Sequence, residues 1–267
     1  MKRSINIVLT LVISISMLVG CGNNSKEIVR TDGSTSMEKV IGALGESFQN
    51  NTGITFTYNP TGSGSGIKAV LEGRCDIGLS SRELKGDEKD AGLDITILGY
   101  DGIVMIVNTS NPIDDLSLEM VGKIYKGEIT NWSEVGGNDE EIVLVGREAG
   151  SGTRDGFESI TNTENICNYR QELTSSGDVM TTVSQNPGAI GYISIASVKD
   201  TVKTMTVNGV AATEETIKNG TYVIIRQFML VTRSDEKLSE ASQKFFDYVT
   251  SKEARDIISA VGVVPAN

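Results

Sequence analysis

A chain of 267 residues can form one large domain or two smaller ones, and its content of 39% hydrophobic and 22% charged residues is typical of a globular protein. The net charge of −11 disfavours nucleic acid and anionic lipid as partners, and the lack of histidine excludes Ser-His-Asp and Cys-His catalysis and His-ligated zinc. A site for an anion in so acidic a chain would depend on short-range hydrogen bonds, because long-range attraction is absent.

The N-terminal residues 1–20 have the layout of a signal peptide. Two basic residues precede an uncharged, mostly apolar stretch over residues 5–19, and Leu-Val-Gly-Cys ends it at Cys21. This ending resembles a bacterial lipobox, which implies that Cys21 becomes the first mature residue and carries a lipid, such as palmitate, that anchors the chain. Residues 22–26 then form a polar tether. An uncleaved membrane anchor or a plain secretory signal is the alternative.

Strand-like and helix-like segments alternate from residue 28 onward, and this order predicts an α/β fold with a parallel sheet covered by helices on both faces. Strands are expected at Ile28–Thr31, Ile54–Tyr58, Asp76–Ser80, Ile103–Asn108, Ile142–Gly146, Ile190–Ile193 and Tyr222–Val231. Helices are expected at about 36–50, 64–72, 118–125, 152–160, 179–185, 235–250 and 251–260.

Two of the expected strands look alike. Ile103–Asn108 and Gln227–Thr232 are both apolar runs that end in a polar residue. If they pair as hinge strands, they join a first lobe made of residues 27–102 plus 231–267 to a second lobe made of residues 108–226. One continuous sheet is the alternative.

Glycine-serine turns follow three of the expected strands, and each turn opens an expected helix. The turns are Asp32–Ser36, Thr61–Gly66 and Arg147–Arg154. The first N–H groups of a helix lack intrahelical partners and carry partial positive charge, while serine and threonine add hydroxyl donors. One such turn alone is usually a plain N-cap. Three together predict a site for one tetrahedral oxyanion, with the guanidinium of Arg147 as its formal counter-charge.

The motifs that contain these turns resemble those of the phosphate-binding proteins of bacterial high-affinity phosphate transport, and the resemblance spans essentially the whole chain after Lys26. The motifs are DGSTSM at 32–37, GSGSGIKAV at 62–70, DIGLSSREL at 76–84, DGIVMIVN at 101–108, REAGSGTR at 147–154 and NPGAIGYIS at 186–194. The resemblance implies a periplasmic-binding-protein-like clamp, in which two lobes joined by two hinge strands close over the ligand.

The resemblance also implies a function and its partners. The chain would be a monomeric solute-binding lipoprotein on the extracellular face of the cell membrane, and it would hand inorganic phosphate to the permease subunits and ATPase of an ABC importer. No cofactor, metal or catalytic residue is expected. The implied phosphate ligands are Thr35, Ser36, Ser63, Ser81, Arg147, Ser151, Gly152 and Thr153.

One position departs from the pattern of the family. Members of the family often carry an aspartate where this chain has Ser81, and that carboxylate accepts the proton of hydrogen phosphate and rejects sulfate. Asp101 is a possible replacement acceptor, or else a residue that caps a strand. Arg82 is expected to pair with nearby acids or to contact the opposite lobe, and the role of Arg154 stays open.

Other functions remain open at this stage. The same clamp would serve sulfate, molybdate or tungstate, an enzyme would use one of the loop serines, and a surface adhesin or sensor would reuse the fold. An enzyme is disfavoured because the chain has no histidine to act as a base and no GxSxG motif. Cys75 and Cys167 are expected to be separate thiols, with a disulfide as the alternative.

Overall fold

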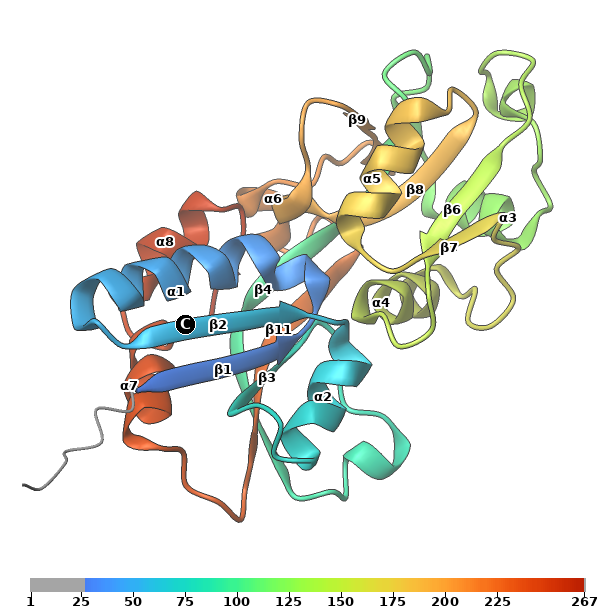
Figure 1. Cartoon of the computed structure of the whole chain (residues 1–267). Helices are drawn as coiled ribbons and strands as arrows, with labels where there is room; N and C mark the ends of the chain where they lie inside the picture. Colours follow the sequence, from blue (N-terminus) through green and yellow to red (C-terminus); the bar gives the residue numbers. More distant parts are fainter. Residues whose placement is uncertain (1–26, 267) are drawn as a thin grey trace, which may run out of the picture.

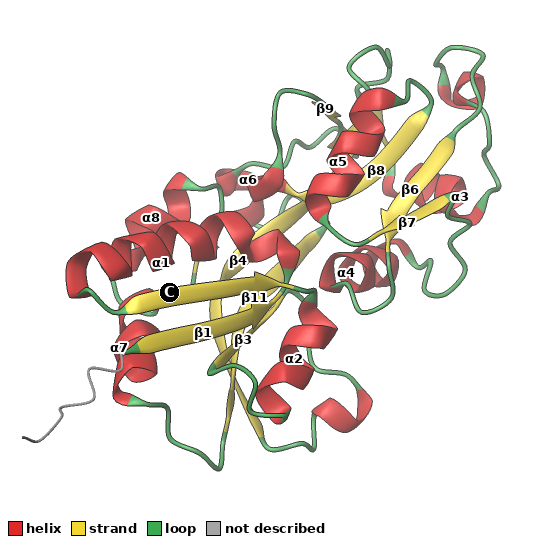
Figure 2. Cartoon of the chain, in the orientation of Figure 1, coloured by secondary structure: helices red, strands yellow, loops and turns green. Residues whose placement is uncertain are grey.

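The computed structural model describes residues 27–266, which form the mixed α/β arrangement in Figures 1 and 2. The strands are β1 (Ile28–Gly33), β2 (Thr55–Pro60), β3 (Ile77–Ser80), β4 (Leu93–Val107), β5 (Asp115–Leu116), β6 (Val143–Arg147), β7 (Gln171–Leu173), β8 (Ala189–Ser194), β9 (Lys203–Thr204), β10 (Thr206–Val207), β11 (Ile225–Arg233) and β12 (Val264–Pro265). The helices are α1 (Glu38–Thr52), α2 (Ser63–Leu71), α3 (Leu118–Lys126), α4 (Gly152–Thr161), α5 (Ser176–Gln185), α6 (Glu214–Lys218), α7 (Glu240–Val249) and α8 (Ala254–Ala260).

Ten of these strands belong to one sheet, whose main path runs β2-β1-β3-β11-β4-β8-β6-β7, with β9 and β12 paired along β4. The pairs at the two ends of this path are parallel, as expected for strand-helix-strand units. In the middle, β11 is antiparallel to both β3 and β4, and β4 is antiparallel to β8. The α/β class is confirmed, but the expected all-parallel sheet is wrong, because β4 and β11 run against their neighbours.

Strand β4 is much longer than the sequence predicts. It begins at Leu93 rather than Ile103 and has 15 residues. Its first part, up to Gly102, pairs with β11, and its second part pairs with β8. The missed part contains polar residues, two glycines and several exposed or half-buried positions, so it lacks the continuous apolar run that predicts the second part.

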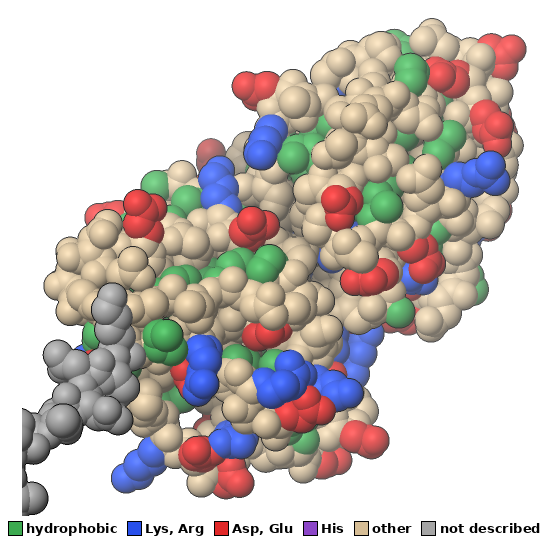
Figure 3. Space-filling view, viewed as in Figure 1, with side chains coloured by type: hydrophobic (Ala, Val, Ile, Leu, Met, Phe, Trp, Pro, Cys, Tyr) green, Lys and Arg blue, Asp and Glu red, His purple; other side chains and the backbone are tan. Residues whose placement is uncertain are grey.

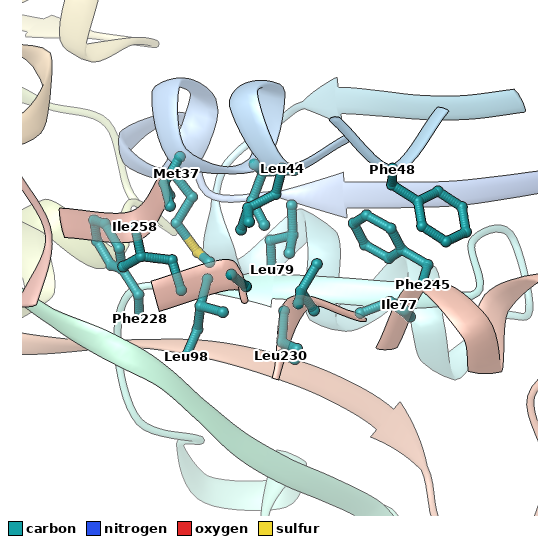
Figure 4. Close-up of a cluster of buried hydrophobic side chains, with 14 of the residues drawn as sticks. Met37, Leu44, Phe48, Ile77, Leu79, Leu98, Phe228, Leu230, Phe245 and Ile258 are labelled. Atoms are coloured by element: carbon teal, nitrogen blue, oxygen red, sulfur yellow. The ribbon is translucent and has the colours of Figure 1, made fainter. Parts of the chain in front are cut away.

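The first hydrophobic core lies where helices α1, α7 and α8 cover β1 and β3. Val40, Ile41, Leu44 and Phe48 form the buried face of α1, at the spacing of an amphipathic helix. Phe48 meets Phe245 of α7 edge to face, with ring centroids 5.2 Å apart (Figure 4). Helix α2 packs on the other face of these strands through Ile67, Ala69 and Val70.

The second core surrounds β8 and β6. Helix α5 packs on one face with Val179, Met180 and Val183, and helices α3 and α4 pack on the other. Phe157 of α4 stacks on Tyr192 of β8 with ring centroids 4.0 Å apart. The two cores lie largely within residues 27–102 plus 228–263 and residues 103–224, which is compatible with the predicted lobes. The division into lobes stays a prediction, because hydrogen bonds join both parts in one sheet.

The sequence predicts separate thiols at Cys75 and Cys167 and a lipid anchor at Cys21. Cys75 is buried and Cys167 is half-buried, and both are free thiols. Cys21, the predicted lipidation site, lies outside the described residues, as does the predicted signal peptide. Among the helices of residues 27–266, none is long and apolar enough to cross a membrane.

Candidate functional site

The three glycine-serine turns, which follow β1, β2 and β6, meet at one place. After β1, residues Thr35–Met37 form a 3-10 turn before α1 begins at Glu38, so this helix starts two residues later than predicted. The second turn enters α2 at Ser63, and the third enters α4 at Gly152. Figure 1 shows α4 beside the start of α2, at the junction of the two parts of the fold.

Hydroxyl groups link the first turn to the third. Ser36 Oγ lies 2.6 Å from Thr153 Oγ1, and it lies 3.5 Å from Ser176 Oγ at the start of α5. All three side chains are buried. This corner therefore combines hydroxyls from the turn after β1, from the start of α4 and from the start of α5, although these segments lie far apart in the sequence.

The second and third turns are in direct backbone contact. The amide of Gly64 donates to the carbonyl oxygen of Gly150 at 3.0 Å. Gly152 lies so close to the second turn that a Cβ added to it would be 2.5 Å from the hydroxyl oxygens of both Ser63 and Ser81. Only glycine fits this approach, which is the reason for a glycine at this point of the turn.

Ser81, directly after β3, lies at the centre of a second group of hydroxyls. Ser34 Oγ donates to Ser81 Oγ at 2.8 Å, and Ser63 Oγ lies 3.2 Å from it. The amide of Ser81 donates to Ser63 Oγ at 3.0 Å. The guanidinium of Arg226, in β11, also reaches Ser81 Oγ, with Nη1 donating at 3.4 Å.

Arg147, the last residue of β6, supplies the positive charge that the sequence predicts. Its guanidinium donates to the carbonyl oxygens of Leu173 and Thr174 at 3.0 and 2.7 Å, and weakly to Ser176 Oγ at 3.4 Å. The side chain is 1% exposed, and within residues 27–266 no carboxylate forms a salt bridge with it. Burial lowers the pKa of Arg147 to about 10, and the nearby charge of Arg226 acts in the same direction.

The turns also hold polar groups that lack an internal partner. Thr35 Oγ1 is buried and has no hydrogen-bond partner among the described residues. The first amides of α2 and α4, at Ser63 and Gly152, belong to the N–H groups that a helix leaves without intrahelical acceptors. Ser151 has a capping role, since its Oγ accepts from the amide of Arg154. Amides, hydroxyls and a guanidinium around one point are suited to bind an oxyanion.

Asp101 has partners that the sequence did not suggest. It is fully buried, accepts a hydrogen bond from Ser194 Oγ at 2.6 Å, and forms a salt bridge with Arg226 at 2.8 Å. Burial raises the pKa of Asp101, while Arg226 and Ser194 oppose that rise. Because its oxygens are engaged by these partners, the predicted role as proton acceptor is not favoured. Asp101 is no strand cap either, since it lies within β4.

Sequence reasoning gave no role to three residues of the site: Ser34, which lies inside the first predicted turn, Ser176 and Arg226. Nothing in the sequence distinguishes the two serines from ordinary caps. Arg226 was detectable in principle, because a charge inside a β-prone run is costly to bury unless it has a partner.

Arg82 and Arg154 take supporting positions. Arg82 Nε lies 3.0 Å from Asp155 of α4, and its Nη1 binds Glu88 at 2.7 Å. Lys85 also reaches Asp155, at 2.7 Å. Arg154 donates to the carbonyl oxygen of Arg147 at 3.0 Å and pairs with Glu158. These contacts stabilise the third turn.

Acidic and basic side chains are interspersed on the face of the molecule shown in Figure 3, so this face has no broad basic surface. Within residues 27–266, no group of three His, Cys, Asp or Glu side chains is placed to hold a metal ion. Recognition of an anion would thus depend on the enclosed groups of the three turns.

Comparison with known proteins agrees with this geometry. The sequence model of the PBP superfamily domain matches residues 22–253. The phosphate-binding protein PstS of Borreliella burgdorferi is 30% identical over 96% of this chain and 96% of its own length. This chain belongs to the phosphate-binding proteins of the PBP superfamily.

Solved structures of this family have the same fold. A substrate-binding protein from Clostridium perfringens, crystallised with bound phosphate, is 40% identical and superposes with a TM-score of 0.87 over 90% of this chain and 100% of its own. An ABC-type phosphate transport receptor from Vibrio cholerae is 32% identical, with a TM-score of 0.73 over 89% of this chain and 100% of its own. The fold and family that the motifs implied are therefore confirmed.

Proposed function

We propose that this protein binds inorganic phosphate between its three glycine-serine turns and delivers it to an ABC importer. The observation that carries the proposal is the buried guanidinium of Arg147, which has hydroxyls beside it and no carboxylate partner among the described residues. A buried charge of this kind is costly until an anion compensates it. The phosphate-binding names of the relatives, and the phosphate in the Clostridium perfringens structure, favour phosphate over sulfate or molybdate.

The proposed ligands are those that the resemblance implied, with the addition of Ser176 and without Ser81, whose hydroxyl and amide are engaged by Ser34, Ser63 and Arg226. Binding would occur between two lobes, with residues 27–102 plus 231–267 on one side and residues 108–226 on the other. In this scheme the contacts Ser36–Thr153 and Gly64–Gly150 join the lobes, and the described structure is the closed form.

The lipid anchor at Cys21 is part of the proposal and rests on the sequence alone. It would keep a monomeric binding protein on the outer face of the membrane, next to the permease subunits. Replacing Cys21→Ser is expected to release the protein into the medium. A variant that stays with the membrane fraction would show that Cys21 does not anchor it.

Titration calorimetry with phosphate, arsenate and sulfate tests the binding claim. About a dozen hydrogen bonds, less desolvation and association costs, support a binding free energy of about −8 kcal/mol, which corresponds to a micromolar dissociation constant. Sulfate bound as tightly as phosphate would reject the assignment. Turnover of a chromogenic phosphate ester would argue instead for an enzyme, whereas we expect binding without hydrolysis.

A further inference from the structure

Arg226 is a second buried guanidinium beside the turns, and neither the motifs nor the family resemblance gives it a role. Its side chain is 6% exposed. Its Nε donates to Asp101 at 2.9 Å, and its Nη2 lies 2.8 Å from the same carboxylate. The remaining Nη1 donates to Ser81 Oγ. The ion pair therefore reaches the hydroxyls of the site through one contact, at Ser81.

This contact fixes the direction of the hydrogen bonds among the hydroxyls of Ser34, Ser63 and Ser81. Ser81 Oγ accepts from Ser34 Oγ and from Arg226, which occupies both of its lone pairs. Its own proton then has Ser63 Oγ as the neighbouring acceptor, at 3.2 Å. Ser63 Oγ also accepts from the amide of Ser81, so its two lone pairs are used as well. The proton of Ser63 is left to point away from this network.

We propose that Arg226 is a positioning residue that sets anion specificity: acting through Ser81, it holds the Ser63 hydroxyl as a hydrogen-bond donor to the bound oxyanion. This proposal rests on the proposed phosphate function. Because Ser63 can only donate, the oxygen of the bound anion that faces it must carry no proton. The proton of hydrogen phosphate must then face a hydroxyl with free accepting capacity, such as Thr35 Oγ1, which has no partner among the described residues.

The contacts from Asp101 through Arg226 and Ser81 to Ser63 form a relay. The test compares the binding of phosphate and sulfate in variants that break this relay at different points. Asp101→Asn with Arg226→Met removes both buried charges together, which avoids leaving one unpaired. Ser81→Ala keeps the ion pair and removes only the linking hydroxyl. Each change frees a lone pair on a site hydroxyl, so Ser63 gains the ability to accept a proton from the ligand.

The measured quantity is the ratio of the sulfate to the phosphate dissociation constant at one pH, with phosphate measured by calorimetry and sulfate by its displacement of bound phosphate. We expect the ratio to rise about fivefold in each variant, the equivalent of one modest hydrogen bond. A triple variant that combines Ser81→Ala with Asp101→Asn and Arg226→Met is expected to have the same ratio as Ser81→Ala alone, because the relay is already broken.

Arg233→Gln is the matched control. Arg233 lies in the same strand as Arg226, but it pairs with Glu236 away from the site. Its ratio is expected to equal that of the wild type. Three results would overturn the role of Arg226. The ratio could be unchanged in Ser81→Ala, the effects of Ser81→Ala and of the Asp101/Arg226 changes on the ratio could add fully, or sulfate could fail to displace phosphate from the wild type. Wild-type protein that binds no phosphate would instead overturn the proposed function itself.

Discussion

The guanidinium of Arg147 is buried and has no carboxylate partner among residues 27–266. Its hydrogen bonds to Leu173 and Thr174 satisfy donors but do not neutralise charge, and burial lowers its pKa to about 10. Arg226, in contrast, has Asp101 beside it. The two arginines therefore differ in function: Arg147 is available to a ligand, and Arg226 is already compensated.

Arg147→Ala is expected to weaken phosphate binding by at least about 3 kcal/mol, which is more than a hundredfold in the dissociation constant, because the bound anion loses its formal counter-charge. Calorimetry of the purified variant gives the number. A loss smaller than tenfold would show that Arg147 lies outside the site.

Gly152→Ala tests the close approach of the third turn to the second. The added Cβ would lie 2.5 Å from Ser63 Oγ and Ser81 Oγ and 2.9 Å from the carbonyl carbon of Ser81, so the turns must separate. We expect phosphate binding to weaken at least about tenfold, on the scale of one or two lost hydrogen bonds.

Gly42→Ala is its control, because a Cβ there meets nothing within 4 Å and lies on helix α1. That variant is expected to bind phosphate normally and to gain about 0.5–1 kcal/mol in unfolding free energy from helix propensity. Normal phosphate binding by Gly152→Ala would contradict the described contact.

At the scale of elements, the sequence predicts well where a strand turns into a helix. The turns at β1, α2 and α4 were found because glycine next to serine or threonine has a local meaning, which is an N-terminus with free amides. The first part of β4 and the short strands β5, β7, β9, β10 and β12 were missed. Their pairing depends on partners distant in the chain, such as Val264 beside Tyr100, and no local pattern encodes it.

The same distinction explains the site. Thr35, Ser36, Ser63 and Thr153 lie in the turns themselves, so their positions follow from local sequence. Ser176 and Arg226 approach from other elements, and only the fold brings them near. Their contribution was beyond any argument based on spacing.

Helix α4 is also held to the opposite part of the fold by an ion-pair cluster. The carboxylate of Asp155 lies between Arg82, at 3.0 Å, and Lys85, at 2.7 Å. The side chain of Arg82 is only 7% exposed, so its contact is less screened than a surface pair. We expect this cluster to stabilise the closed form proposed above.

Asp155→Asn is therefore expected to speed phosphate release about fivefold, equivalent to about 1 kcal/mol, with a smaller effect on association. Stopped-flow kinetics measures both rates. Glu119→Gln, which disrupts an exposed pair with Lys123, serves as the control and should leave release unchanged. An unchanged release rate in Asp155→Asn would show that the cluster does not hold the closed form.

At the scale of the whole molecule, two cores share one sheet. Strands β4 and β11 are the elements that pass between them, since β4 pairs first with β11 and then with β8. If β4 and β11 act as the predicted hinge, the two parts would rotate about this pair of strands while each core stays intact. The predicted hinge and the alternative of one continuous sheet are therefore compatible.

Phosphate is expected to make the protein more compact and more stable. In small-angle scattering, the radius of gyration should fall on addition of phosphate, and the melting temperature should rise with phosphate concentration by mass action. Sulfate at the same concentration should have a smaller effect on both. A radius that does not change would argue that the lobes do not open.

A crystal structure of the protein grown with phosphate tests the central claim most directly. The account predicts one tetrahedral anion between the three turns, within hydrogen-bond distance of the Arg147 guanidinium and of hydroxyls or amides from residues 35–36, 63 and 151–153. Phosphate bound elsewhere, or a cleft without phosphate at saturating concentration, would contradict it.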